Sequence, residues 1–155
     1  MKKIMNMFSN NKNEQRLDNE GEKKVKLFIV DDNELEAELI EKNLLFRQNN
    51  KLTPLSFDIE LFPNGEECLY NIYKEPDIII LDYYLGSQSD DDAFNGDKVY
   101  KEIVRLIPSQ SVIVLSGQQE GKIVHELIRI GVRHYIIKDD EMFDNLINLI
   151  EEIMQ

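Results

Sequence analysis

The sequence predicts an α/β fold, a doubly wound parallel sheet of five strands with helices on both faces. Five short apolar runs are each followed by a stretch with apolar residues at helical spacing, and this alternation is typical of parallel sheets. Two of the runs, residues 77–82 and 111–117, are nearly continuous in apolar residues, as expected of strands covered on both faces. The length of 155 residues suits one domain of this kind.

The first half of the chain alternates strand and helix twice. Residues 26–30 are an apolar run that ends in two acids, and residues 56–62 alternate apolar and polar side chains as a half-buried strand does. Asn33 and Asn64 are each followed three positions later by a glutamate, a pattern that resembles a capping box and predicts two helix starts. Apolar residues at helical spacing are Leu35, Leu39, Ile40 and Leu44 in the helix at 34–47, and Leu69, Ile72 and Tyr73 in the next helix.

The second half repeats the alternation three times. Strands are expected at residues 77–82, 111–117 and 134–138. One helix is expected after a polar loop that runs to Asn95 and Gly96, and another covers residues 120–130 and ends at Gly131 in the position of a C′ glycine. Inward apolar residues are Val99, Ile103 and Ile107 in the former, and Met142, Leu146, Leu149, Ile150 and Ile153 in a closing helix.

Composition excludes several classes of protein. The formal net charge of −12 argues against a nucleic-acid-binding body, which would present basic side chains to the phosphates. No apolar run approaches the roughly 20 residues of a membrane span. Cys68 is the single cysteine, which excludes an internal disulfide and a cysteine-rich zinc site and fits a reducing, cytoplasmic setting.

Residues 1–24 differ from the remainder of the chain. They carry six basic and four acidic side chains and lack periodic apolar residues beyond the first few, which predicts a flexible N-terminal tail ahead of a domain at 25–155. An alternative is a docking arm that uses Ile4, Met7 and Phe8.

The residues at the predicted strand ends carry the chemistry. Ligands of open parallel sheets bind beyond the carboxyl ends of the strands. Those ends carry Asp31 and Asp32, Asp82, Ser116, and Lys138 on the first, third, fourth and fifth strands. Three neighbouring carboxylates repel one another, and a hard cation that keeps several waters, such as Mg²⁺, would relieve that repulsion.

This set of groups suits phosphoryl transfer. A metal ion and a lysine stabilise charge on phosphoryl oxygens, and a carboxylate can act as the nucleophile to give an aspartyl-phosphate. The hydroxyl of Ser116 can donate to a phosphoryl oxygen, and Gly117 leaves the approach open because it has no side chain.

The motifs together resemble the receiver domain of bacterial two-component response regulators, of the single-domain, chemotaxis-regulator-like kind. They are residues 28–32, 78–82, 112–117 and 131–138, and the resemblance covers about residues 25–155. It implies the flavodoxin-like strand order 2-1-3-4-5. It also implies a phosphoacceptor switch rather than an enzyme, with at most slow catalysis of its own phosphorylation and dephosphorylation.

The resemblance also implies roles for individual residues. Asp82 would accept a phosphoryl group from a sensor histidine kinase or phosphotransfer protein. Asp32 would bind Mg²⁺ directly and Asp31 through water, with Asp82 and the backbone carbonyl of Tyr84 completing the protein ligands. Lys138 would bind the phosphoryl group.

Phosphorylation would be transmitted by two further residues. Ser116 would move towards the phosphoryl group and Tyr135 would swing inward as the coupled aromatic switch, altering the surface of the fourth helix, fifth strand and fifth helix. A downstream protein target would bind there. In physical terms, the added phosphoryl group favours one of two packing arrangements of this surface over the other.

The sequence departs from the family pattern in three places. Asp139 stands where proline usually follows the lysine, and the loop from Gly86 to Asn95 is long and contains three successive aspartates at 90–92. Tyr84 and Gln118 occupy positions that influence access of hydrolytic water in the family, and the bulk of Tyr84 predicts slow loss of the phosphoryl group.

Three other functions are alternatives to the switch. An aspartate-nucleophile phosphatase would need a second acid two residues after the nucleophile, where this chain has Tyr84. A flavin or nucleotide binder would present Gly, Ser or Thr amides after the first strand, where this chain has two aspartates. A non-phosphorylated pseudo-receiver that only binds proteins stays open, because of Asp139 and the long acidic loop.

Overall fold

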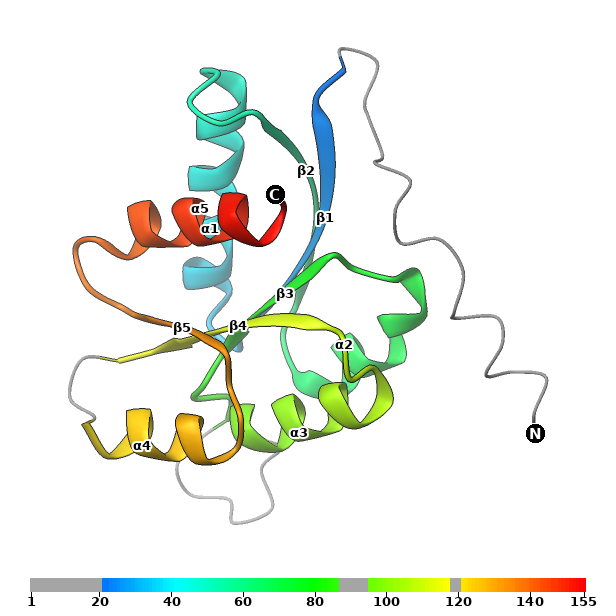
Figure 1. The fold of residues 1–155 in the computed structure, drawn as a ribbon, viewed down its shortest axis with the longest axis vertical. Helices are drawn as coiled ribbons and strands as arrows, with labels where there is room; N and C mark the ends of the chain where they lie inside the picture. The colour runs from blue at the N-terminus through cyan, green and yellow to red at the C-terminus, as the bar shows by residue number, and fades with distance from the viewer. Residues whose placement is uncertain (1–20, 87–94, 118–120) are drawn as a thin grey trace.

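The fold is the predicted five-stranded parallel sheet, with strand order β2-β1-β3-β4-β5 (Figure 1). The computed structural model describes residues 21–86, 95–117 and 121–155. The strands are β1 (Lys23–Val30), β2 (Leu55–Phe62), β3 (Ile78–Asp82), β4 (Ser111–Ser116) and β5 (His134–Ile137). The helices are α1 (Glu34–Asn49), α2 (Gly65–Tyr70), α3 (Gly96–Leu106), α4 (Gly121–Arg129) and α5 (Met142–Ile153), with a 3₁₀ turn η1 at Ile72–Lys74.

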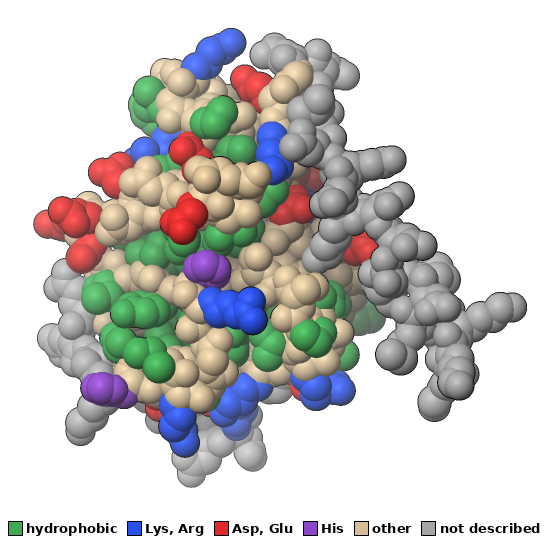
Figure 2. Space-filling view, viewed as in Figure 1, with side chains coloured by type: hydrophobic (Ala, Val, Ile, Leu, Met, Phe, Trp, Pro, Cys, Tyr) green, Lys and Arg blue, Asp and Glu red, His purple; other side chains and the backbone are tan. Residues whose placement is uncertain are grey.

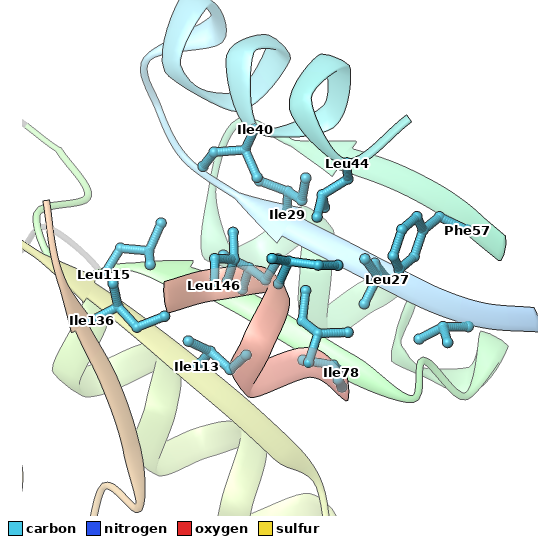
Figure 3. Close-up of a cluster of buried hydrophobic side chains, with 14 of the residues drawn as sticks. Leu27, Ile29, Ile40, Leu44, Phe57, Ile78, Ile113, Leu115, Ile136 and Leu146 are labelled. Carbon is cyan, nitrogen blue, oxygen red and sulfur yellow. The ribbon is translucent and has the colours of Figure 1, made fainter. Parts of the chain in front are cut away.

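Helices cover both faces of the sheet and create two hydrophobic cores. Helices α1 and α5 lie on one face, where Ile40, Leu44 and Leu146 pack against Leu27 and Ile29 of β1 (Figures 1 and 3). On the other face, α2, α3 and α4 pack against the alternate residues of the same strands, which include Phe28, Val30, Ile79, Leu81 and Val114. Since side chains of a strand alternate between faces, a strand covered on both sides must be apolar throughout.

The register of the strands brings their carboxyl ends to one edge. Val30 of β1 is paired with Leu81 of β3, Asp82 of β3 with Leu115 of β4, and Ser116 with Ile137 of β5. Residues that follow β1, β3, β4 and β5 therefore emerge together at this edge, as the alternation of strands and helices predicts.

Three local expectations are wrong. Leu35 and Leu39 are exposed on α1, because Ala37 shares the inward stripe with Ile40 and Leu44. The second helix ends at Tyr70 and is followed by η1, which leaves Tyr73 exposed. Strand β1 begins at Lys23, two residues before the predicted start of the domain.

The predicted helix ends at Asn33, Asn64 and Gly131 are confirmed. The side chain of Asn33 accepts from the backbone N–H groups of α1, and that of Asn64 does so in α2. Gly131 has a φ of +86°, a left-handed conformation in which a side chain would be strained.

The two ends of the described fold lie next to each other. Lys23 at the start of β1 donates from its ammonium to the backbone carbonyl of Met154, just beyond α5. In the described parts of the chain no helix has both the length and the apolar character needed to cross a bilayer. Most of the predicted tail, the aspartates at 90–92 and Gln118 lie outside the described residues.

Candidate functional site: an acidic cluster with a lysine

Three aspartates meet at the carboxyl edge of the sheet. Asp31 follows β1, Asp32 comes next, and Asp82 ends β3. One carboxylate oxygen from each lies within 4.8 Å of the others. Asp31 and Asp82 are buried, whereas Asp32 is exposed. The cluster is therefore open to solvent on the side of Asp32.

Backbone hydrogen bonds fix two of these carboxylates. Asp31 Oδ1 accepts from the backbone N–H of Asn33 at 2.8 Å, and the backbone N–H of Asp31 donates to the carbonyl of Phe62 at 3.1 Å. Asp32 Oδ2 accepts from the backbone N–H of Gly86 at 3.2 Å. This last bond ties the segment after β3 to the acidic cluster.

Lys138 comes to the cluster from the end of β5. Its backbone N–H donates to the carbonyl of Ser116 at 2.7 Å, so β4 sets its position. Its Nζ lies 2.9 Å from Asp82 Oδ1 and 3.9 Å from Asp31 Oδ2. Glu36 contributes a fourth carboxylate, with Oε2 at 2.6 Å from the same ammonium.

Burial disfavours the charged form of the two inner aspartates. It raises the pKa of Asp31 to about 6, with the neighbouring Asp82 adding to the shift and the Asn33 N–H and Lys138 opposing it. Burial also raises the pKa of Asp82, although Lys138 counteracts this. For Lys138, burial lowers the pKa, but Glu36, Asp82 and Asp31 together raise it above the ordinary value. The ammonium is thus held in its charged form.

The donor set fits a magnesium ion. Asp31 Oδ2 and Asp82 Oδ1 are buried and, among the described residues, have no aligned hydrogen-bond donor, even though Lys138 lies within ion-pair distance of both. Buried carboxylate oxygens without donors are costly, and a hard cation with oxygen ligands removes that cost. Asp31, Asp32 and Asp82 are the residues that could hold it.

Gly96 allows α3 to begin directly against the site. A Cβ at this position would lie 2.6 Å from the backbone oxygens of both Asp82 and Tyr83. The N–H of Gly96 donates to the carbonyl of Tyr83 at 3.1 Å. Only glycine allows so close an approach of helix to strand end, a requirement that the sequence analysis did not identify.

The other predicted site residues lie around the cluster. Ser116 is buried at the end of β4, and a Cβ on Gly117 would meet no atom of the described residues within 4 Å. Tyr84 follows Asp82 by two residues, and its partly exposed ring is edge-on to that of Tyr83. Tyr135 lies on β5 and is 38% exposed.

Sequence reasoning missed the place of Glu36 in this site. Its spacing from Asn33 predicts only a capping pattern, yet its side chain turns to Lys138. One signal was available, because the first turn of α1 directly follows Asp32 and so lies at the same edge as the aspartates.

Asp139 stands where the sequence analysis expects a proline in the family. Its carboxylate accepts a hydrogen bond from the backbone N–H of Glu141 at 2.9 Å, in the loop before α5.

A partly apolar surface flanks β5. Figure 2 shows hydrophobic side chains on the face where β5 lies between α4 and α5. The exposed apolar residues of this region are Ile128, Tyr135 and Ile137. Acidic side chains lie above this surface in the same view, on and near α5, and basic ones lie below it.

Two curated proteins are similar to this chain in sequence. In sequence, the chain is 32% identical over 77 residues to the chemotaxis protein CheY of Thermotoga maritima, which covers 48% of this chain and 58% of CheY. It is 30% identical over 94 residues to the uncharacterized transcriptional regulatory protein YesN of Bacillus subtilis, and this match covers 58% of the chain and 24% of YesN. The chain thus spans about a quarter of one relative and just over half of the other.

Solved structures share the fold. The receiver domain of NtrX from Brucella abortus superposes with a TM-score of 0.67 at 22% identity, over 83% of this chain and 97% of that one. A putative response regulator from Chloroflexus aurantiacus gives 0.68 at 23% identity, over 86% and 100%. Residues 27–151, which hold the acidic cluster and Lys138, match the family model of the response regulator receiver domain. The chain therefore belongs to the receiver domains of two-component systems.

Proposed function

We propose that this chain is a phosphorylation switch in which Asp82 accepts the phosphoryl group in a magnesium-dependent reaction. Receiver domains interact with histidine kinases or phosphotransfer proteins, and the family works as a phosphoacceptor switch. The observation that carries the proposal is the Lys138 ammonium at 2.9 Å from the buried carboxylate of Asp82, inside a cluster of three aspartates.

The chain's own groups divide the work of phosphoryl transfer. A carboxylate oxygen of Asp82 attacks the phosphorus of the donor, forming the aspartyl-phosphate while the bond to the donor's leaving group breaks. Lys138, held charged by its neighbours, stabilises the negative charge on the phosphoryl oxygens. Mg²⁺, when bound, would supply further stabilisation of negative charge. Asp31, Asp32 and the backbone carbonyl of Tyr84 are the groups we assign to its binding.

We extend the proposal to the output. Ser116 lies at the end of β4, next to Lys138, and its hydroxyl is the group we assign to the phosphoryl oxygen. Tyr135 then shifts inward and changes the surface of α4, β5 and α5, whose exposed apolar residues include Ile128 and Ile137. A downstream protein would bind this surface, after a sensor histidine kinase or phosphotransfer protein has supplied the phosphoryl group.

Intact mass spectrometry tests the central step. The chain is incubated with Mg²⁺ and acetyl phosphate, and we expect the mass of one added phosphoryl group. Asp82→Asn should abolish the gain. Asp58→Asn is the matched control, because Asp58 lies on β2 in a partly exposed pair with Lys24, and it should be phosphorylated like the wild type. No gain in the wild type would contradict the proposal and favour the pseudo-receiver.

A further inference from the structure

Lys138 has a closer carboxylate than that of the proposed phosphoacceptor. Its Nζ lies 2.6 Å from Glu36 Oε2, compared with 2.9 Å from Asp82 Oδ1 and 3.9 Å from Asp31 Oδ2. Glu36 and Lys138 both line a surface pocket of about 550 Å³ between α1 and the start of α5, with Leu39, Met142 and Phe143. The pair therefore lies at the open side of the site, where Glu36 has room to move.

The start of α1 explains why Glu36 is available to Lys138. In a complete capping box the glutamate would accept from the N–H of the capping residue. Here the N–H of Asn33 already donates to Asp31 Oδ1 at 2.8 Å. The carboxylate of Glu36 instead accepts from Lys138 through Oε2, while Oε1 lies 3.4 Å from the side-chain amide of Asn33. The acidic cluster and the capping residue together direct Glu36 towards the lysine.

We infer that Glu36 competes with the phosphoryl group for the Lys138 ammonium and so weakens the binding of that group at Asp82. The inference rests on the proposed function. A lysine has three N–H donors, and three carboxylates already surround this one. Of these carboxylates only that of Glu36 accepts an aligned hydrogen bond from Lys138, and Glu36 is partly exposed. A phosphoryl oxygen that approaches the ammonium therefore competes first with Glu36.

Charge points in the same direction. Four carboxylates and one ammonium sum to −3 before any metal is bound. With a divalent cation the site would reach −1, whereas the three aspartates, the cation and Lys138 alone would sum to zero. An incoming anionic group is therefore repelled by one more negative charge than it would meet in a site without Glu36.

Binding of beryllofluoride, an anion that mimics the phosphoryl group on aspartate, tests the competition. Affinity is measured by calorimetry at Mg²⁺ concentrations that saturate each variant. Glu36→Gln should bind about two- to fivefold more tightly than the wild type, the range expected for a partly exposed ion pair. Glu38→Gln is the matched control, since it makes the same charge change on the same helix but removes a pair with Lys42. It should bind like the wild type.

Glu36→Asp separates the hydrogen bond from the charge. It keeps the carboxylate but shortens the side chain by one methylene, which takes it out of reach of Lys138. If Glu36 competes through its hydrogen bond to Lys138, Glu36→Asp should bind beryllofluoride more tightly than the wild type, as Glu36→Gln does. Wild-type affinity in Glu36→Asp, or in Glu36→Gln, would overturn the inference. If the wild type binds no beryllofluoride at all, the proposed function fails and the inference fails with it.

A metal-free measurement checks the pair itself. Urea unfolding in EDTA is compared for the wild type, Glu36→Gln, Lys138→Gln and the double variant, as a double-mutant cycle. We expect favourable coupling between Glu36 and Lys138, and none in the same cycle with Glu38→Gln. Absence of coupling at Glu36 would overturn the inference without bearing on whether Asp82 is phosphorylated.

Discussion

Among single residues, Asp31 has the environment that folding changes most. Its side chain is almost fully buried, and Oδ2 has no hydrogen-bond donor among the described residues. Burial is the main reason that its pKa rises to about 6. Between about pH 4 and pH 6, the folded protein therefore holds a proton on Asp31 that the unfolded chain has already lost. The stability contributed by this protonation is fully present below about pH 4 and is lost as the pH rises through about 6.

This predicts that Asp31→Asn stabilises the metal-free protein at neutral pH. Asparagine keeps the acceptor for the N–H of Asn33 but carries no charge to desolvate. We expect a gain on the order of 1–3 kcal/mol in the free energy of unfolding at pH 7.5, disappearing below pH 4. Urea unfolding in EDTA across this range measures the gain, with Asp58→Asn, at a partly exposed aspartate of β2, as the control. A variant less stable than the wild type at pH 7.5 would contradict the prediction.

Tyr84 carries a second prediction at this scale. Its ring is partly exposed beside the acidic cluster and contacts Tyr83 edge-on. We expect it to limit access of water to the aspartyl-phosphate, so Tyr84→Ala should shorten the lifetime of the phosphorylated protein several-fold. Intact mass spectrometry after removal of acetyl phosphate follows the decay. Tyr73→Ala, at an exposed tyrosine of η1, is the control and should leave the lifetime unchanged. Equal decay rates in Tyr84→Ala and the wild type would show that Tyr84 does not limit access of water.

At the scale of elements, the junction between β3 and α3 depends on one glycine. A Cβ on Gly96 would overlap the backbone of Asp82 and Tyr83, and backbone atoms at a buried strand end have little freedom to move. The start of α3 is therefore in direct contact with the residue proposed to be phosphorylated.

Gly96→Ala should destabilise the protein by about 1–3 kcal/mol, as other overpacked buried sites do. Urea unfolding at constant pH measures the change. Gly117→Ala is the matched control for stability, because a Cβ there would meet nothing within 4 Å, and it should change the unfolding free energy little. Equal stability of the two variants would show that α3 can move away from β3 without cost.

Elements also show what the sequence could predict. Strands β3 and β4 can be located because their apolar runs are buried on both faces. The aspartates and Lys138 meet because parallel strands end at one edge. The inward stripe of α1 was misassigned, since Leu35, Leu39 and Ala37 all fit helical spacing and only packing against β1 and α5 selects Ala37. The contact between Glu36 and Lys138 joins residues far apart in the sequence, and a capping pattern does not reveal which way a side chain turns.

For the whole molecule, the two cores share one sheet, and the acidic cluster lies where β1 and β3 end between them. An ion bound by Asp31, Asp32 and Asp82 would join the end of β1 to the end of β3. Occupancy of the cluster should therefore affect the stability of the entire fold rather than that of one loop.

We expect Mg²⁺ to raise the melting temperature. At a concentration one hundred times its dissociation constant, binding to the folded state alone contributes about 2.7 kcal/mol. Thermal unfolding is compared in MgCl₂ and in NaCl of equal ionic strength, because salt alone screens the net charge of −12. Asp32→Asn should remove most of the difference. An identical melting temperature in the two salts would exclude magnesium binding.

The contact between Lys23 and Met154 has a practical consequence for every experiment on this protein. Strand β1 starts at the pole of the sheet remote from its carboxyl edge, and the neighbouring end of α5 leaves the fold at that same pole. A fluorophore, affinity handle or fusion partner attached directly before β1 or after α5 would leave from one side of the molecule. Immobilised that way, the protein would present its reactive pole outward to an incoming phosphodonor.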